Sequence, residues 1–310
     1  MILISGKSGQ LGGELTELFE KEKVEFKAFD SREWDITDYQ KNHSIIEKIK
    51  PNLIINCAAY TAVDKAESDI DRAYKVNRDA LENIAKSIKD SSIKLLHIST
   101  DYVFSGIECG GPSEICRIKP FEPKDKTSPQ SVYANSKNEG DKAVQKILSY
   151  NNKMRNSFII RTSWLYSKNR NNFVKTMLRL AKDDKIEDIR VVEDQIGRPT
   201  WAARLAQFIF LFIKEKKLNT EPSIEGGLYH FANSGIASWY DFAYEIIKMA
   251  YELKIINRRK LVLPISTEEY PLPAKRPHYS VLNLESAKEV MQNIPHWKND
   301  LNRCLREMKL

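Results

Sequence analysis

The sequence of this 310-residue chain predicts an α/β protein, with a doubly wound parallel sheet and a smaller C-terminal lobe. Short apolar runs alternate with helical patterns from the first residue, as in repeated strand–helix–strand units. Runs such as LIIN and KLLHIS are almost continuously apolar, which is typical of strands covered by helices on both faces. A glycine-rich turn between the first strand and the first helix is the third observation.

The elements follow one another regularly in the first hundred residues. The pattern predicts strands at 1–5, 25–30, 53–59 and 94–100. Helical patterns lie at 11–23 and 68–89, and the run 44–51 follows the second strand.

The rest of the chain is more broken. Glycine, proline, serine and charged residues dominate 105–131 and predict a long loop. A strand is expected at 158–166. The expected helices are 133–148, 172–183, 238–253 and 284–292.

Composition argues against several classes of protein. The 49 basic and 42 acidic residues give a net charge of +7 but are spread along the chain, with no basic block that would indicate nucleic-acid binding. The longest apolar run, 205–213, is too short for a membrane-spanning helix, and no charged leader precedes the first strand. We therefore expect a soluble cytoplasmic protein. Neither a metal site nor a disulfide framework is expected, because there is no CxxC pair and no companion histidine among Cys57, Cys109, Cys116 and Cys304.

Gly6, Gly9 and Gly12 follow the first strand at G-x-x-G-x-x-G spacing and open a helix. Glycine allows a sharp turn and a close approach to a pyrophosphate, whose charge the helix N-terminus stabilises. The spacing is a variant of the G-x-G-x-x-G fingerprint, and the alternative is a plain glycine-rich turn. The position directly after the first strand favours a dinucleotide, with the amides near Gln10 and Leu11 facing its phosphates.

Asp30 ends the second predicted strand, about twenty residues beyond the glycines. A carboxylate there can bind both ribose hydroxyls and repels a 2′-phosphate, which favours NAD. Arg32 lies two residues further on and could neutralise such a phosphate. The choice between NADH and NADPH stays open.

Tyr133 and Lys137 lie four residues apart, on one face of a predicted helix. A phenol with a pKa near 10 exchanges protons poorly at neutral pH, and a nearby ammonium favours the phenolate. The pair alone is a weak signal. Its position after a glycine-rich turn and beyond a strand that ends in Thr100 indicates a catalytic site.

Together these features resemble the extended short-chain dehydrogenases/reductases and, within them, the dTDP-4-dehydrorhamnose reductase family. The resemblance runs along most of the chain, and several motifs are specific to the reductase group. They are GKSGQLG (6–12), INCAAYTAVDKAE (55–67), STDYVF (99–104), VYANSK (132–137), RTSWLY (161–166), DQIGRPT (194–200) and RPHYSVL (276–282).

The resemblance implies a Rossmann-type NAD(P)-binding domain over 1–184 and 203–233, with a substrate-binding lobe over 185–202 and 234–310. The implied activity is the reduction of the C4 keto group of a nucleotide-activated 4-keto-6-deoxysugar by NADPH or NADH. The main expected substrate is dTDP-4-dehydro-L-rhamnose, and the product is dTDP-L-rhamnose.

The resemblance also assigns roles to residues. Tyr133 would give a proton to the C4 oxygen, Lys137 would tune Tyr133 and hold the nicotinamide ribose, and Thr100 would hydrogen-bond the carbonyl. Asp101 and Trp164, with Thr100, fall where the family holds the sugar. Besides the glycine motif, Tyr133 and Lys137, the implied dinucleotide-binding positions are Gly9, Gln10, Leu11, Asp30, Asp35, Ile36, Ala59, Tyr60 and Thr61.

Two departures stand out. Ala134 follows the tyrosine where the family more often has glycine, and the loop 105–128 is longer than expected, which leaves the exact sugar nucleotide open. Cys109 and Cys116 in this loop are interpreted as incidental. Family members can form homodimers with an interface metal, but no ligand cluster predicts that metal here.

Two alternatives compete with a reductase. A 4,6-dehydratase needs a further acid and base, and related dehydratases have Asp-Glu after the threonine; here Tyr102 follows Asp101, which disfavours elimination. Another reductase or epimerase of the superfamily stays open. The second alternative is a non-catalytic binding protein, because the regulatory subunit of methionine adenosyltransferase resembles the same reductases.

Overall fold

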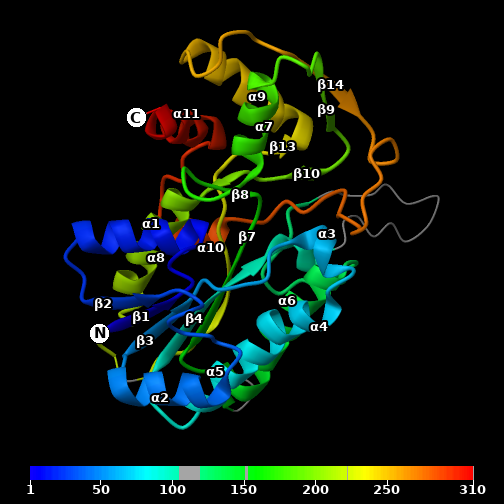
Figure 1. The fold of residues 1–310 in the computed structure, drawn as a ribbon. Helices are drawn as coiled ribbons and strands as arrows, with labels where there is room; N and C mark the ends of the chain where they lie inside the picture. The colour runs from blue at the N-terminus through cyan, green and yellow to red at the C-terminus, as the bar shows by residue number, and fades with distance from the viewer. Residues whose placement is uncertain (105–118, 151–152, 222, 310) are drawn as a thin grey trace.

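The central element of the computed structural model is a six-stranded, entirely parallel sheet (Figure 1). The structure describes residues 1–104, 119–150, 153–221 and 223–309. The strand order is β12-β7-β4-β3-β1-β2. The strands are β1 (Ile2–Ser5), β2 (Phe26–Phe29), β3 (Leu53–Asn56), β4 (Lys94–Thr100), β7 (Ser157–Thr162) and β12 (Gly227–His230). The predicted α/β class and parallel sheet are confirmed.

Helices cover both faces of this sheet, which explains its continuous apolar strands. On β1, Ile2 and Ile4 pack with α1 (Gln10–Lys21) and α8 (Ala202–Glu215), whereas Leu3 points to the opposite face. Successive side chains of a strand alternate between faces, so both faces need apolar residues. The opposite face is covered by α2 (Tyr39–Ile49), α5 (Ala80–Ile88) and α6 (Val132–Ile147).

The helix predicted at 68–89 is built from three consecutive segments. They are α4 (Ile70–Tyr74), the π-helical segment η1 (Lys75–Asp79) and α5, preceded by the short α3 (Val63–Ala66). Single π-helical turns within helices are frequent at functional sites.

The order of the strands reverses at β1, which lies between β2 and β3. In open α/β sheets, ligands bind outside the carboxyl ends of the strands at such a switch point. Here the glycine-rich turn follows β1, and the loop that begins at Cys57 follows β3.

A second apolar cluster forms the C-terminal lobe, at the top of Figure 1. Its helices are α7 (Phe173–Lys182), α9 (Trp239–Glu252) and α11 (Trp297–Lys309). Its strand pairs are β9 (Asp188–Val192) with β14 (Leu261–Ile265), β10 (Ile196–Gly197) with β13 (Ala237–Ser238), and β8 (Leu165–Tyr166) with β11 (Thr200–Trp201). Helix α7 packs against α9, and the boundaries drawn at 184, 202 and 233 stay a prediction.

Several elements differ from the sequence prediction, and helix α8 and strand β12 are among those that were not predicted. The strand expected at 158–166 ends at Thr162, because Trp164 adopts a left-handed φ of 45° that breaks the extended backbone before β8. The helix expected at 284–292 is only α10 (Glu285–Lys288). Helix α11 was not predicted.

The remaining short elements are η2 (Asp101–Val103) and the hairpin β5 (Ser149–Tyr150) with β6 (Lys153–Met154). Most of the predicted loop 105–131, with Cys109 and Cys116, lies outside the described residues. Within the described ranges, no helix is both long and apolar enough to cross a membrane.

Candidate functional site

The glycine-rich turn fits a close-packed backbone that side chains would obstruct. Gly6 has a φ of 77°, and a Cβ there would lie 2.8 Å from the Ala58 nitrogen. A Cβ on Gly12 would lie 2.1 Å from the Gly6 carbonyl oxygen. Gly9 precedes the first turn of α1, where no side chain caps the free N–H groups. This N-terminus can therefore bind an anion.

Gln10 and Leu11 begin α1 and differ in their surroundings. The Gln10 Oε1 atom is buried and has no hydrogen-bond partner within the described part of the chain. Such an orphaned acceptor beside a free helix N-terminus fits a site that a bound group completes. The Leu11 side chain packs in the core, so only its backbone is available to a ligand.

Asp30 follows β2 and holds Arg32. The Asp30 carboxylate accepts hydrogen bonds from Arg32 Nε at 3.2 Å and Nη2 at 2.7 Å. These bonds lower the pKa of Asp30 to about 2. Arg32 itself is 90% exposed, so the guanidinium can turn towards another anion. Beside the pair, Lys7 from the glycine-rich turn binds Glu33 at 2.6 Å.

Asp35 and Ile36 are less directly available. The exposed Asp35 carboxylate accepts hydrogen bonds from the backbone nitrogen and hydroxyl of Thr37. The Ile36 side chain is buried in the core under α2, and its carbonyl accepts a hydrogen bond from Asn42. A ligand would meet Ile36 only through its backbone.

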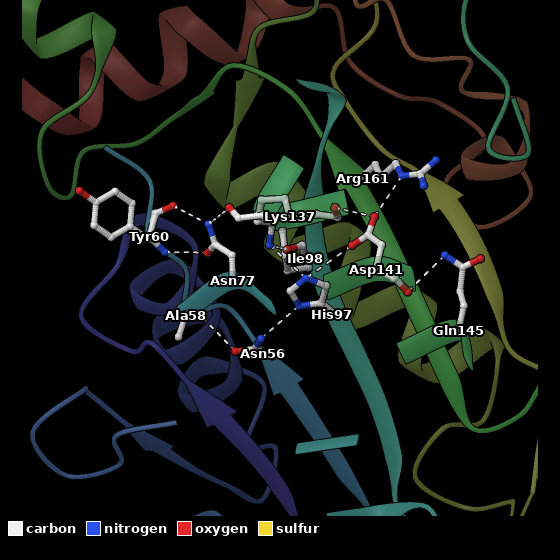
Figure 2. Close-up of polar contacts among 12 residues, drawn as sticks. Asn56, Ala58, Tyr60, Asn77, His97, Ile98, Lys137, Asp141, Gln145 and Arg161 are labelled. Carbon is white, nitrogen blue, oxygen red and sulfur yellow. Dashed lines mark hydrogen bonds and ion pairs between the residues drawn. The ribbon is translucent and has the colours of Figure 1, made fainter. Parts of the chain in front are cut away.

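The loop over Ala59, Tyr60 and Thr61 is tied to the π-helical segment by Asn77 (Figure 2). The Asn77 amide accepts from the Tyr60 nitrogen at 2.9 Å and donates to the Tyr60 carbonyl at 3.1 Å. It also donates to the Ser136 hydroxyl on α6 at 3.0 Å. Asn77 thus joins the predicted cofactor loop to the helix that carries Lys137. Sequence analysis did not single out Asn77.

Thr100 and Tyr133 meet where β4 ends and α6 begins. Ser131 caps α6 by accepting a hydrogen bond from the Ala134 nitrogen. Burial raises the pKa of Tyr133 to about 12, and a side-chain hydrogen bond with Thr100 acts in the opposite direction. Tyr133 is therefore protonated at neutral pH, as a proton donor must be. The Tyr102 ring packs edge-on against it, with centroids 6.0 Å apart.

Lys137 lies one turn further along α6 and is buried (Figure 2). Its Nζ atom lies 3.0 Å from His97 Nε2 and donates to the Ile98 carbonyl at 2.8 Å, so it sits against β4 two residues before Thr100. Burial lowers the pKa of Lys137 to about 8, against the opposing field of Asp141. A group with this pKa exists in both protonation states near neutral pH.

A buried polar cluster lies beneath Lys137, and it was not predicted. His97 and Ser99 on β4 contact Asp141 on α6: Ser99 donates to Asp141 Oδ2 at 2.8 Å, and His97 Nε2 lies 3.8 Å from Oδ1. Arg161 on β7 also faces this carboxylate, with Nε 3.4 Å from Oδ2. Polar residues inside the run KLLHIST were the only sequence signal for it.

Asp101 follows Thr100 and contacts the C-terminal lobe. It accepts hydrogen bonds from the Ser280 hydroxyl at 2.5 Å and from the Thr100 hydroxyl at 3.3 Å. Burial raises the pKa of Asp101 to about 7, so protonated and ionised forms coexist near neutral pH. The motif containing Ser280 was noted in the sequence, but no role was predicted for that residue.

Trp164 lies in the core of the lobe beside the site. One face of its indole stacks on Trp239, with ring centroids 3.6 Å apart. Gly197 lies so close to the ring that a Cβ there would be 2.6 Å from Trp164 Cε2. Only the part of the indole away from Trp239 is available to a ligand.

A bidentate ion pair joins the lobe to the short helix α3. Arg276 donates to Asp64 Oδ1 at 3.0 Å and to Oδ2 at 2.7 Å. Both residues lie in motifs noted in the sequence, but the pairing itself was not predicted. Among the described residues, no group of three or more histidine, cysteine or acidic side chains could hold a metal ion.

Comparisons with known proteins show the family to which the chain belongs. The profile of the RmlD substrate binding domain family matches residues 1–310. The chain is 39% identical to a dTDP-4-dehydrorhamnose reductase of Aggregatibacter actinomycetemcomitans, over 99% of this chain and 98% of that protein. The chain belongs to the dTDP-4-dehydrorhamnose reductase family. The resemblance seen in the motifs is confirmed.

Solved structures of the dTDP-4-dehydrorhamnose reductase family have the same fold. A reductase of Clostridium acetobutylicum is 36% identical, with a TM-score of 0.85, covering 100% of this chain and 99% of the other. A reductase of Bacillus anthracis, solved in complex with NADP, is also 36% identical, with a TM-score of 0.82 over 99% and 98% of the two chains.

Proposed function

We propose that this chain reduces the C4 keto group of a nucleotide-activated 4-keto-6-deoxysugar with NADPH or NADH, with dTDP-4-dehydro-L-rhamnose as the first candidate substrate and dTDP-L-rhamnose as product. The observation that supports this most directly is the arrangement of Thr100, Tyr133 and Lys137 at the carboxyl edge of the sheet. Family membership supports the same reaction.

The dinucleotide supplies the hydride when bound, and residues around the switch point fit it. The free N–H groups of α1 suit a pyrophosphate, and the unpartnered Gln10 Oε1 can accept a hydrogen bond from a hydroxyl or amide of the dinucleotide. Asp30 is proposed to bind the adenosine ribose, and the loop over Ala59, Tyr60 and Thr61 is proposed to contact the same dinucleotide. Asp35 and Ile36 stay predicted contacts.

Tyr133 is proposed to donate its proton to the C4 oxygen while Thr100 hydrogen-bonds the same oxygen. The raised pKa of Tyr133 keeps the phenol protonated until charge develops on the substrate oxygen. Lys137 stands one helical turn away, and its pKa of about 8 suits it to restore the proton of the phenol. Asp101 and Trp164 are proposed to hold the sugar.

Cofactor choice depends on Arg32. The relative from Bacillus anthracis was solved with NADP, and the exposed Arg32 is free to turn from Asp30 towards a 2′-phosphate. We propose that both NADPH and NADH serve and that NADPH is preferred. Cytoplasmic location and homodimer formation stay predictions.

Elimination is disfavoured because Tyr102 stands where related dehydratases have Glu, and desolvation raises the pKa of this half-buried phenol, so it does not replace the carboxylate. A non-catalytic binding subunit is the remaining alternative, and turnover separates it from an enzyme. We expect the purified protein to oxidise NADPH when given dTDP-4-dehydro-L-rhamnose. A panel of 4-keto-6-deoxysugars with other nucleotide bases and other configurations at the remaining ring carbons would define the substrate. If no member of the panel is reduced, with either dinucleotide, the proposal is wrong.

A further inference from the structure

The immediate neighbour of the Lys137 amine is His97, a buried histidine with no role in the proposed reaction. Its Nε2 atom lies 3.0 Å from Lys137 Nζ, and its Nδ1 atom lies 3.1 Å from Asn56 Nδ2 (Figure 2). The ring is 1% exposed, so no water layer separates it from these partners. Each ring nitrogen therefore has a defined protein partner.

Asn56 fixes which ring nitrogen carries the proton. The Asn56 Oδ1 atom accepts from the Ser5 hydroxyl at 2.6 Å and from the Ala58 nitrogen at 3.2 Å. Because the Ala58 N–H needs an acceptor, the amide cannot be turned round, and its Nδ2 donor faces the histidine. His97 Nδ1 must then accept, so a neutral ring carries its proton on Nε2, towards Lys137.

This tautomer opposes a protonated Lys137. An ammonium has three N–H donors and no acceptor, so it would meet the Nε2–H of His97 donor against donor. A neutral amine has a lone pair that accepts from Nε2–H, and it can still donate to the Ile98 carbonyl. The hydrogen bond is therefore complete only in the neutral state of Lys137.

Other groups around the Lys137 amine also affect the equilibrium between its neutral and protonated forms. Asp141, on the same helix as Lys137, favours the ammonium. Its Oδ2 faces Ser99 and Arg161, and its Oδ1 lies 3.8 Å from His97 Nε2 and has no hydrogen-bond partner among the described residues. Burial raises the pKa of the Cys57 thiol after β3 to about 12, which keeps it neutral. Tyr133 is neutral as well.

We infer that His97 is a positioning residue of the reductase: it holds the Lys137 amine against β4 and, through its Nε2–H, stabilises that amine after its proton has passed to Tyr133. In the step concerned, Tyr133 loses its proton to the C4 oxygen and becomes a phenolate. Lys137 then gives one proton to the phenolate, which restores the phenol and leaves a neutral amine. Solvent later returns a proton to the amine. The inference rests on the proposed function, because only turnover would use this exchange.

The first test measures the tautomer directly. In the full-length protein labelled with ¹⁵N-histidine, with and without NADP⁺, we expect NMR to show His97 as a neutral ring with a bare Nδ1 and a protonated Nε2. The His97→Gln variant identifies its signals among the five histidines. An Nδ1–H tautomer, or an imidazolium at pH 7, would contradict the inference. This test needs no substrate, so it stands even if the proposed reaction fails.

The second test uses the pH dependence of reduction. A glutamine side chain in place of His97 can rotate to accept from the ammonium, so His97→Gln should raise the pKa of Lys137 and move the basic limb of the kcat profile upward by roughly 1 pH unit. We expect kcat at pH 7 to fall roughly tenfold with little change in KM, because His97 does not contact substrate.

His230→Gln is the matched control, since His230 is equally buried at the end of β12. It should leave the basic limb unchanged. A His97→Gln enzyme with the wild-type limb and kcat would overturn the inference. Absence of turnover in the wild-type protein would instead overturn the proposed function and with it the role of His97 in turnover, and the tautomer would then test only the hydrogen bond between His97 and Lys137.

Discussion

Two carboxylate–guanidinium pairs lie near the carboxyl edge of the sheet and differ in their surroundings. Asp141 and Arg161 are buried beneath the candidate catalytic residues, with side chains 0% and 2% exposed. Asp30 and Arg32 lie at the adenosine end, where Arg32 is 90% exposed. The pKa of Asp141 is raised by burial, whereas the pKa of Asp30 is lowered by its hydrogen bonds to Arg32.

The difference separates two tasks. A buried pair is expensive to break, so it suits groups that must keep one geometry, such as His97 and Lys137. An exposed pair is weak and rearranges easily, so Arg32 can exchange Asp30 for a ligand anion. Changes at the buried end should therefore have large effects on turnover or stability, and changes at the exposed end should alter selectivity alone.

The largest effect is expected at the buried end with Tyr133→Phe. Removing the proton donor should lower kcat by about a thousandfold, because general acid catalysis contributes roughly 10²–10⁴. Steady-state NADPH oxidation measures this, and an unchanged circular dichroism spectrum is the control that the variant is folded. A variant with kcat within tenfold of wild type would exclude Tyr133 as the donor.

Breaking the buried pair with Asp141→Asn should lower the free energy of unfolding by about 4 kcal/mol, because an uncompensated buried guanidinium remains. Urea unfolding measures the loss. Glu139→Gln on the same helix removes an exposed partner of Lys142 and should cost less than about 1 kcal/mol. Equal losses in the two variants would remove the distinction between buried and exposed pairs.

Buried Asp101 should make the free energy of unfolding depend on pH. Its pKa in the folded protein is about 7, above the ordinary value of 3.8, so the folded state binds the proton more tightly than the unfolded state. The protein should then lose stability relative to Asp101→Asn as pH rises from 4 to 7, on the order of 3 kcal/mol. Urea unfolding of both proteins at several pH values checks this. A constant difference between them would show that Asp101 titrates normally.

The smallest effect is expected at the exposed pair. Arg32→Ala should lower the preference for NADPH over NADH by about tenfold in kcat/KM, because one charge-assisted contact to a 2′-phosphate is lost. Urea unfolding should not change. Lys27→Ala, which changes an exposed residue of the nearby edge strand β2, is the matched control and should keep the wild-type ratio. An unchanged ratio in Arg32→Ala would mean that Arg32 does not contact the phosphate.

The parallel sheet was predictable because each of its inner strands is a short apolar run, and burial on both faces requires that pattern. The break at Trp164 was not predictable, because RTSWLY contains no glycine, proline, asparagine or aspartate that would indicate a turn, and yet the backbone at Trp164 turns left-handed. Helix α11 was missed because its charged residues conceal the buried side chains of Leu301, Cys304 and Leu305.

The parts of the candidate site that were predictable are motifs of residues close together in the sequence, such as the glycine-rich turn and the Tyr133–Lys137 pair. The cluster beneath Lys137 joins residues far apart in sequence, such as Asn56, His97 and Asp141. Such contacts depend on which strands are neighbours and in what register, as between Asn56 on β3 and His97 on β4. The sequence alone does not contain that register.

The most direct test of the central claim follows the hydride. The purified protein is given NADPH deuterated at the transferred position of C4, together with dTDP-4-dehydro-L-rhamnose, and the product is examined by NMR. The account predicts one deuterium at C4 of the sugar. Product without deuterium at C4, or dinucleotide that stays reduced, would contradict it.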